Sequence, residues 1–211
     1  MSVSATLVNN SEGYRLWAPT YDESLNPMVA LEERGLADSI PRAGRVIDVA
    51  CGTGRWLKRL RRTAELIVGI DLSPEMLARC DSRSLVRGDA LRLPFASASA
   101  DLVLCSLALS YMTPPRAAVE EMLRVGGTVF VTDVHPEAAR RGWKHSFRRE
   151  GFVYEIENRP YRLSDLPPAD EIRELHFGEP ERHIFERAAK AGYFDEACRI
   201  PAIWMLKWQA R

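Results

Sequence analysis

Short apolar segments alternate with amphipathic segments of helical spacing along this chain, and the alternation limits the folds it can adopt. Five apolar segments have the length of strands: residues 45–50, 66–71, 84–88, 100–105 and 127–133. Helical segments separate several of them, over residues 56–62, from residue 74 to about residue 80, and over residues 116–124. Strands joined through helices pair in parallel by right-handed crossovers. The pattern therefore predicts an α/β protein with a mostly parallel sheet.

The rest of the chain completes this prediction. Residues 134–168 are rich in basic, aromatic and turn-forming residues and contain no helix of matching length, so we expect an insertion or lid after the fifth strand. Residues 171–177 and 202–208 are expected to form two closing strands, with a helix over residues 180–191 between them. We predict a single domain (1–211) with a doubly wound, mostly parallel seven-stranded sheet, helices on both faces, and an N-terminal cap over residues 1–40.

Composition and charge exclude several classes of protein. Because 29 basic residues balance 29 acidic ones, a nucleic-acid partner is not expected. The longest apolar run, residues 102–109, is far shorter than the roughly 20 residues that span a bilayer, so no membrane anchor is expected. The first basic residue is Arg15, and four cysteines form no CxxC pair. Both features favour a cytoplasmic protein with reduced thiols.

The chemistry of such a fold lies at the carboxyl ends of the parallel strands, where the strand order reverses. The first predicted strand ends in Asp48-Val-Ala-Cys-Gly52-Thr-Gly54, and the two glycines allow a ligand to approach the backbone. Asp71 ends the second strand, 19 residues after Gly52, at the distance where a carboxylate accepts hydrogen bonds from ribose hydroxyls. Together the two features predict a nucleoside site.

The nucleoside is expected to lack phosphates. A dinucleotide fingerprint requires a third glycine at position 57, where this chain has Leu57. The third strand ends in Gly88-Asp89-Ala90-Leu91, where the Asp89 carboxylate is able to accept from an exocyclic amine and the Ala90 amide to donate to a ring nitrogen. Apolar Leu72 and Leu91 are placed to flank the base. These residues favour adenosine.

With these motifs the chain resembles the class I S-adenosylmethionine-dependent methyltransferases, especially the small-molecule group that includes quinone-biosynthesis and carrier-ester enzymes. The matching segments are Val46-Ile-Asp-Val-Ala-Cys-Gly-Thr-Gly54, Gly69-Ile-Asp-Leu-Ser-Pro-Glu-Met76, Gly88-Asp-Ala-Leu-Arg-Leu-Pro-Phe95, Asp101-Leu-Val-Leu-Cys-Ser106 and Leu123-Arg-Val-Gly-Gly-Thr128. The resemblance covers about residues 11–133. It is specific for the cofactor and carries no information about the acceptor.

The resemblance implies roles for individual residues. The cofactor is S-adenosylmethionine, which leaves as S-adenosylhomocysteine. The loop with Ala50, Gly52 and Gly54 is expected at its methionine end, and Asp48 is expected to order that loop from beneath. The other implied contacts are Asp71 to the ribose, Leu72, Asp89, Ala90 and Leu91 around the adenine, and Cys105 and Ser106 beside the methionine.

Aromatic residues outside these motifs are candidates for walls of the site. By the resemblance, Tyr14 and Trp17 close over the cofactor and Tyr21 closes over the acceptor. Alternatively, the helical spacing of these three residues places them on one face of a surface helix that only packs. Tyr111 and Trp143 are further candidates for acceptor contacts.

A general base is useful only for an acceptor that arrives protonated, and His135, just beyond the fifth strand, is the candidate. The alternative is an imidazole that caps a loop. Asp133 and His135 lack a third metal ligand, so no metal is expected.

Two basic clusters are candidates for a binding surface. The cluster on the first helix (Arg55, Lys58, Arg59, Arg61 and Arg62) is expected to be a solvated face. The cluster in the insertion (Arg140, Arg141, Lys144, Arg148 and Arg149) is either solvated or attracts an anionic or carrier-bound acceptor.

The resulting hypothesis is methyl transfer to a small-molecule acceptor by in-line displacement, with oxygen or nitrogen favoured as the methylated atom. A cofactor-binding member of the fold without catalysis, acting as a regulator, is the first alternative. A nicotinamide-dependent reductase is the second, and Leu57 and Asp89 disfavour it. The oligomeric state is left open.

Overall fold

A seven-stranded sheet forms the centre of the protein, whose computed structural model describes residues 5–37, 39–188 and 190–210. The strand order is β4-β3-β2-β5-β6-β10-β9. The strands are β2 (Arg45–Val49), β3 (Leu66–Asp71), β4 (Leu85–Arg87), β5 (Ala100–Ser106), β6 (Gly126–Val134), β9 (Glu171–Leu175) and β10 (Ile203–Gln209). The first five are parallel, and β10 runs antiparallel to both β6 and β9. The predicted seven-stranded, mostly parallel sheet is confirmed.

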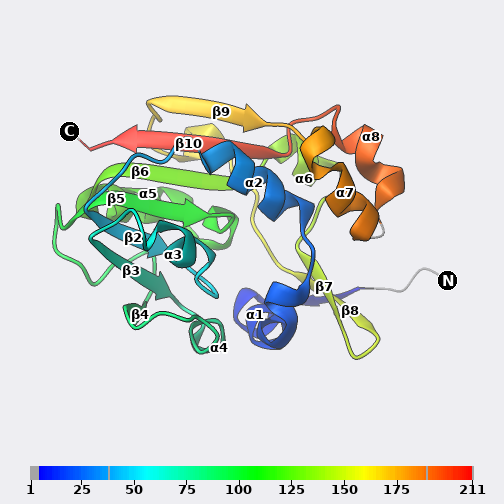
Figure 1. The fold of residues 1–211 in the computed structure, drawn as a ribbon, viewed down its shortest axis with the longest axis horizontal. Helices are drawn as coiled ribbons and strands as arrows, with labels where there is room; N and C mark the ends of the chain where they lie inside the picture. The colour runs from blue at the N-terminus through cyan, green and yellow to red at the C-terminus, as the bar shows by residue number, and fades with distance from the viewer. Residues whose placement is uncertain (1–4, 38, 189, 211) are drawn as a thin grey trace.

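Helices cover both faces of this sheet (Figure 1). On one face, α5 (Pro115–Val125) buries Val119 and Met122 against Val103 and Val129. On the other face, α2 (Pro27–Ala37) and α3 (Arg55–Leu60) pack apolar side chains against Leu104. Because β5 and β6 are covered on both sides, their central residues 102–105 and 129–131 form continuous apolar runs.

The order of the strands shows where along the carboxyl edge of the sheet a ligand is expected to bind. The chain adds β3 and β4 on one side of β2 and then returns to add β5 and β6 on the other side. The carboxyl ends of β2 and β5 therefore flank a crevice where the winding direction reverses, which is where open α/β sheets bind ligands. Paired residues Val49 and Cys105 mark this edge.

A second, three-stranded sheet lies beyond that edge, in the order β1-β8-β7. It joins β1 (Thr6–Val8) to a hairpin of β7 (Ser146–Arg149) and β8 (Phe152–Ile156), so the N-terminal cap and the insertion form one structure. The helix α1 (Asn10–Trp17) and the 3-10 helix η1 (Ala18–Glu23) follow β1. Figure 1 shows α1 beside the hairpin, off the carboxyl ends of the parallel strands.

Some predicted elements differ in length or were missed. The helix expected from residue 74 to about 80 ends early, as α4 (Pro74–Leu77). The helix expected over 180–191 is α7 (Glu179–Arg187), and the short helices η4 (Ala191–Tyr193) and α8 (Phe194–Ala197) follow it. The insertion holds α6 (Pro136–Arg140), the β7–β8 hairpin and the 3-10 turn η3 (Leu163–Asp165), none of which was predicted.

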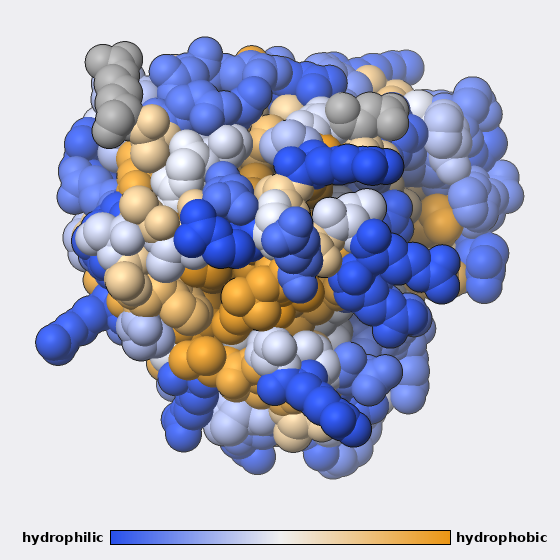
Figure 2. Space-filling view, turned by 60° about the vertical axis from the view of Figure 1, so that its left-hand side comes forward, coloured by the Kyte–Doolittle hydropathy of each residue, from blue (hydrophilic) through white to orange (hydrophobic). Residues whose placement is uncertain are grey.

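Figure 2 shows a face on which hydrophilic residues surround an apolar patch. Within the described part of the chain, no helix has the length and apolar composition that a membrane crossing requires.

Candidate functional site

A cavity of about 350 Å³ lies between the carboxyl edge of the sheet and the cap. This volume is at the lower end of the range of about 300–1,000 Å³ in which small-molecule sites fall. The structure brings eleven of the predicted cofactor and acceptor residues together in its lining: Tyr14, Tyr21, Ala50, Gly52, Asp71, Leu72, Asp89, Ala90, Leu91, Ser106 and Tyr111. Sequence reasoning missed Asn10, Ser11, Met76, Leu107 and Met112, which line the same cavity.

The loop after β2 is held open toward the cavity by an unusual backbone. Ala50, Gly52 and Gly54 all have positive φ, at 56°, 55° and 84°. At Ala50 a side chain occupies this conformation, which costs on the order of 1 kcal/mol relative to glycine. Gly54 does not line the cavity; an added Cβ there would collide with Sγ of Cys80, so this glycine allows close packing at the start of α3.

Asp71 fixes the loop from the neighbouring strand. Its Oδ2 accepts a hydrogen bond from the Gly52 amide at 2.8 Å, and its Oδ1 accepts one from the Ser73 amide at 2.8 Å. A carboxylate has about four acceptor positions, so two further donors can still bind. Burial raises the pKa of Asp71, and the Ser73 and Gly52 amides oppose that rise. The two features that predicted a nucleoside site are thus in direct contact.

Asp89 occupies the corner after β4. Its Oδ1 accepts from the Leu91 amide at 2.9 Å, which orders the turn containing Ala90. Leu72, across the cavity, is 56% exposed. An apolar side chain this exposed at a cavity mouth provides a surface on which a flat ring can stack.

The electrostatic character of the cavity restricts its ligand. Two carboxylates line it, Asp71 and Asp89, and none of the lining residues that the structure describes is Lys, Arg or His. The amide oxygen of Asn10 is buried beside the cavity with no hydrogen-bond partner among the described residues. These acceptors therefore fit a ligand that carries positive charge and hydroxyl or amino donors, and the described lining offers no basic side chain to a phosphate.

Aromatic side chains form the cap side of the site. Tyr14 contacts Tyr111 edge-on, with ring centroids 5.6 Å apart, and both line the cavity. Trp17 does not line it; this side chain is buried beneath Tyr14 and stacks on Phe147 at 5.0 Å. The predicted helical face of aromatics thus packs against the hairpin and presents only its tyrosines to the cavity.

The structure places three other predicted residues away from the cavity lining. Cys105 is fully buried in the sheet, because neighbouring strand residues face opposite sides and Ser106 takes the cavity side. Trp143 packs against Phe177 at 5.8 Å, in the core near α7. Asp48 is buried within β2, beneath the loop.

His135 lies at the start of α6, outside the lining of the cavity. Its Nδ1 accepts from the Glu137 amide at 3.0 Å, and its Nε2 lies 3.2 Å from Oε1 of Glu174. Burial lowers the pKa of His135, and Glu174 opposes that shift. This arrangement matches the alternative of a capping imidazole, and it places His135 outside the cavity lining. Asp133 takes different partners, the amides of Ser110 and Val134.

The burial of Asp48 changes the pKa of its carboxyl group. Among the described residues none donates a hydrogen bond to its carboxyl oxygens. Burial raises the pKa of Asp48 to about 8, although the positive charge of Arg55 opposes the rise. The folded protein therefore holds a proton that the unfolded chain releases near pH 4.

We expect this proton to make the protein less stable as the pH rises. Between about pH 4 and 8 the folded state binds more protons than the unfolded state, so the free energy of unfolding falls by up to about 1.4 kcal/mol per pH unit. Asp48→Asn should remove this slope. Urea unfolding at pH 6, 7 and 8 measures it, and parallel slopes in the two proteins would contradict the assignment.

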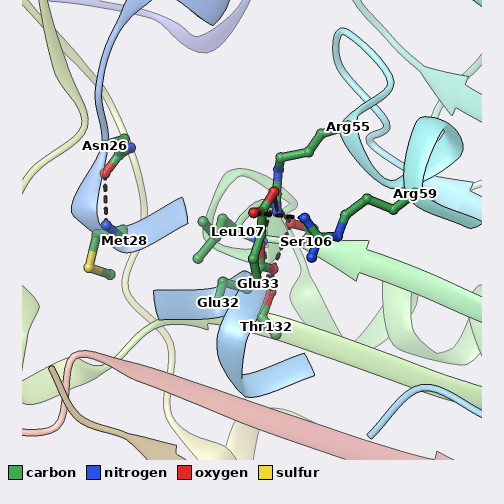
Figure 3. A network of polar contacts seen from close by, with 9 residues as sticks. All are labelled: Asn26, Met28, Glu32, Glu33, Arg55, Arg59, Ser106, Leu107 and Thr132. Atoms are coloured by element: carbon green, nitrogen blue, oxygen red, sulfur yellow. Dashed lines mark hydrogen bonds and ion pairs between the residues drawn. The ribbon is translucent and has the colours of Figure 1, made fainter. Parts of the chain in front are cut away.

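A buried ionic network joins the cap to the cavity edge (Figure 3). Glu32 of α2 is fully buried, and its carboxylate contacts Arg55, Ser106 and Thr132. Ser106 Oγ donates to Oε1 of Glu32 at 2.6 Å and accepts from Arg55 at 2.7 Å. The network therefore connects α2, the start of α3 and the ends of β5 and β6 at one point.

The basic clusters are mostly paired with acids. Arg55 is largely buried against Glu32, so for this residue the predicted solvated face is wrong. Arg59 contacts Glu33 and is exposed, as a solvated face requires. In the insertion cluster, four of the five basic residues have acidic partners: Arg140 and Arg141 with Glu137, Lys144 with Glu155, and Arg149 with Glu150. This pairing leaves little free positive charge to attract an anion.

Several known proteins are similar to this chain in sequence. A family described as a methyltransferase domain matches residues 47–131. An uncharacterized protein of Mycobacterium tuberculosis is 32% identical over 141 residues, which are 59% of this chain and 47% of that protein. A demethylmenaquinone methyltransferase of Beutenbergia cavernae is 40% identical over 96 residues, or 42% of this chain and 40% of the enzyme. The chain thus spans about half the length of the relatives it matches.

A solved structure shows the same fold. The crystal structure of an S-adenosylmethionine-dependent methyltransferase from Mesorhizobium loti has a TM-score of 0.61 and 21% identity, over 86% of this chain and 99% of that one.

Proposed function

We propose, from the premise that this chain belongs to the class I S-adenosylmethionine-dependent methyltransferases, that it transfers a methyl group from S-adenosylmethionine to a small-molecule acceptor. The observation that carries the proposal is the cavity lined by Asp71 and Asp89 without a basic residue among its described lining. A sulfonium nucleoside has the positive charge, the hydroxyls and the exocyclic amine that such a lining accepts. The cofactor, when bound, supplies an activated methyl group.

The chain's own residues hold and orient this cofactor. Asp71 accepts from the ribose hydroxyls with the acceptor positions left by its two backbone contacts. Asp89 and the Ala90 amide recognise the edge of the adenine, and Leu72 stacks on its face. The open loop at Gly52 lets the methionine end approach the backbone, and Asn10 offers a further acceptor.

The protein's main contribution to the reaction is position. Fixing a nucleophile about 3 Å from the methyl carbon in line with the leaving sulfur contributes roughly 7–11 kcal/mol. The side chains of Tyr14, Tyr21 and Tyr111 line the cap side and exclude water there. A wall of rings favours a small apolar acceptor over an anionic or carrier-bound one. Oxygen or nitrogen methylation remains our preferred reaction.

Of the alternatives, a nicotinamide-dependent reductase is disfavoured by two observations. Leu57 fills the position of the third fingerprint glycine, and its Cδ1 lies 2.6 Å from where a Cβ on Gly69 would be. The cavity also lacks a basic group for a pyrophosphate among its described lining. A cofactor-binding regulator, the first alternative, fits the same cavity, because binding the cofactor does not by itself imply catalysis.

Thermal unfolding with ligands tests the proposal. S-adenosylmethionine and S-adenosylhomocysteine at one hundred times their Kd should each stabilise the protein by about 2.7 kcal/mol. Nicotinamide nucleotides should have no effect. Stabilisation by NADPH and not by S-adenosylhomocysteine would contradict the proposal. Transfer of tritiated methyl from S-adenosylmethionine to a pool of small aromatic hydroxyl and amino compounds separates an enzyme from a regulator.

A further inference from the structure

A tyrosine and a histidine from distant parts of the chain meet at the cap side of the cavity. Tyr111 belongs to the 3-10 helix η2 (Leu109–Tyr111) after β5 and lines the cavity. His145 precedes the β7–β8 hairpin of the insertion. The Tyr111 hydroxyl is in hydrogen-bond contact with Nδ1 of His145, and their rings are stacked 5.3 Å apart. The function proposed above assigns no role to the contact between them.

Both partners are held in place by the backbone around them. Before Tyr111, the Ser110 amide donates to Oδ2 of Asp133 at 2.6 Å, and the Ser110 carbonyl accepts from the Arg159 amide at 2.9 Å. The His145 carbonyl accepts from the Ile156 amide at 2.9 Å, which fixes it to β8. Tyr14 packs edge-on against Tyr111 from α1. The geometry of the pair is therefore set by three separate segments.

The direction of the hydrogen bond follows from the surroundings of His145. Burial lowers its pKa to about 4, so the imidazole is neutral at physiological pH. Its partner Tyr111 packs in an aromatic cluster that contains Tyr14, Tyr21 and Tyr154. The neighbouring Lys144 is paired with Glu155. A neutral imidazole has one accepting nitrogen, and Nδ1 in that role takes the Tyr111 proton.

We propose that His145 orients the Tyr111 hydroxyl so that its oxygen accepts a hydrogen bond from the acceptor, which selects an aromatic substrate with a hydroxyl or N–H donor. This inference rests on the proposed function and narrows its acceptor class. With its own proton committed to Nδ1, the Tyr111 oxygen offers only lone pairs to the cavity. The surrounding tyrosines supply the flat apolar walls that an aromatic ring fills. His145 acts through Tyr111 and is a positioning residue.

The test uses phenol and toluene as probes, since both have one aromatic ring and only phenol has a hydroxyl group that donates a hydrogen bond. In protein saturated with S-adenosylhomocysteine, phenol should bind more tightly than toluene by about threefold to tenfold, the value of one hydrogen bond. Titrations followed by NMR measure both affinities. Tyr111→Phe keeps the ring and should abolish the preference. His145→Leu should also abolish it, whereas His145→Asn keeps an acceptor near the position of Nδ1 and should restore part of it.

Binding of S-adenosylhomocysteine to every variant is measured first and separates two failures. If the wild-type protein does not bind it, the proposed function fails. If all variants bind it and keep the same preference for phenol, or if the wild-type protein shows no preference, the role of the pair is overturned. The ¹⁵N signals of His145 add a readout independent of ligands: a neutral ring protonated at Nε2 is expected from pH 5 to 8, and a proton on Nδ1 would contradict the proposed direction.

Discussion

Replacing Glu32 by alanine is expected to destabilise the protein by about 3–5 kcal/mol, the effect of breaking a buried ion pair. Glu32 is fully buried, and its loss leaves Arg55, Ser106 and Thr132 without their shared acceptor. Because these groups join α2 to the carboxyl ends of β5 and β6, the cavity edge should loosen with the fold. Urea unfolding at constant pH measures the change.

The neighbouring Glu33 provides the matched control. It contacts Arg55 and Arg59 but is partly exposed, so Glu33→Ala should cost about 1 kcal/mol or less. The double variant Glu32→Ala/Arg55→Leu removes both buried charges and should recover part of the stability lost by Glu32→Ala. If Glu32→Ala and Glu33→Ala lower the free energy of unfolding equally, the buried network stabilises the protein no more than an ordinary surface ion pair does.

Asp71→Ala is expected to weaken binding of S-adenosylhomocysteine by about 10-fold to 150-fold, or roughly 1.5–3 kcal/mol, because charge-assisted hydrogen bonds are lost. The substitution also frees the Gly52 and Ser73 amides, so the loop loses its anchor. Calorimetric titration measures the affinity. Asp71→Asn keeps the shape of the side chain and removes its charge. Its affinity for S-adenosylhomocysteine should lie between those of the wild-type protein and Asp71→Ala.

Asp101 is the control for this measurement. It lies near the opposite end of the sheet, where its carboxylate pairs with Arg45. Asp101→Ala should therefore leave cofactor affinity unchanged. An affinity that survives Asp71→Ala would remove this carboxylate from the ribose site.

The central sheet was predictable from the sequence because its signals are local. Parallel strands covered on both faces are continuous apolar runs, and each binding motif stands where such a run ends. The link between Asp71 and Gly52 could be inferred because both lie at the carboxyl ends of neighbouring strands. The strand ends and the sequence spacing were enough to predict the residues of the nucleoside half of the cavity.

The cap and the acceptor side depend on contacts between distant segments. The hairpin had one local signal in the sequence, the glycine Gly151. Glu150 and Gly151 both adopt positive φ in the turn, as a type I′ turn requires. The parallel pairing of β1 with β8 had no local signal in the sequence. Glu32 stands among polar residues of α2, and neither Arg55 nor Thr132 is near it in the chain. No spacing rule identifies such partners.

His135 shows how a local signal was misjudged. A histidine followed by Pro136 has the pattern of a residue that precedes a helix, and its imidazole caps α6. Its position just after β6 suggested catalysis, but β10 and β9 extend the sheet beyond β6, and the side chain turns to Glu174 on β9. The histidine that contacts a lining residue of the cavity is His145, which the folded insertion brings to Tyr111.

A crystal structure with S-adenosylhomocysteine tests the central claim most directly. We predict density in the cavity beside Tyr14, with both ribose hydroxyls within hydrogen-bond distance of the Asp71 carboxylate and the adenine amine at Asp89. Density for the ligand elsewhere, or a ribose that does not contact Asp71, would contradict the account.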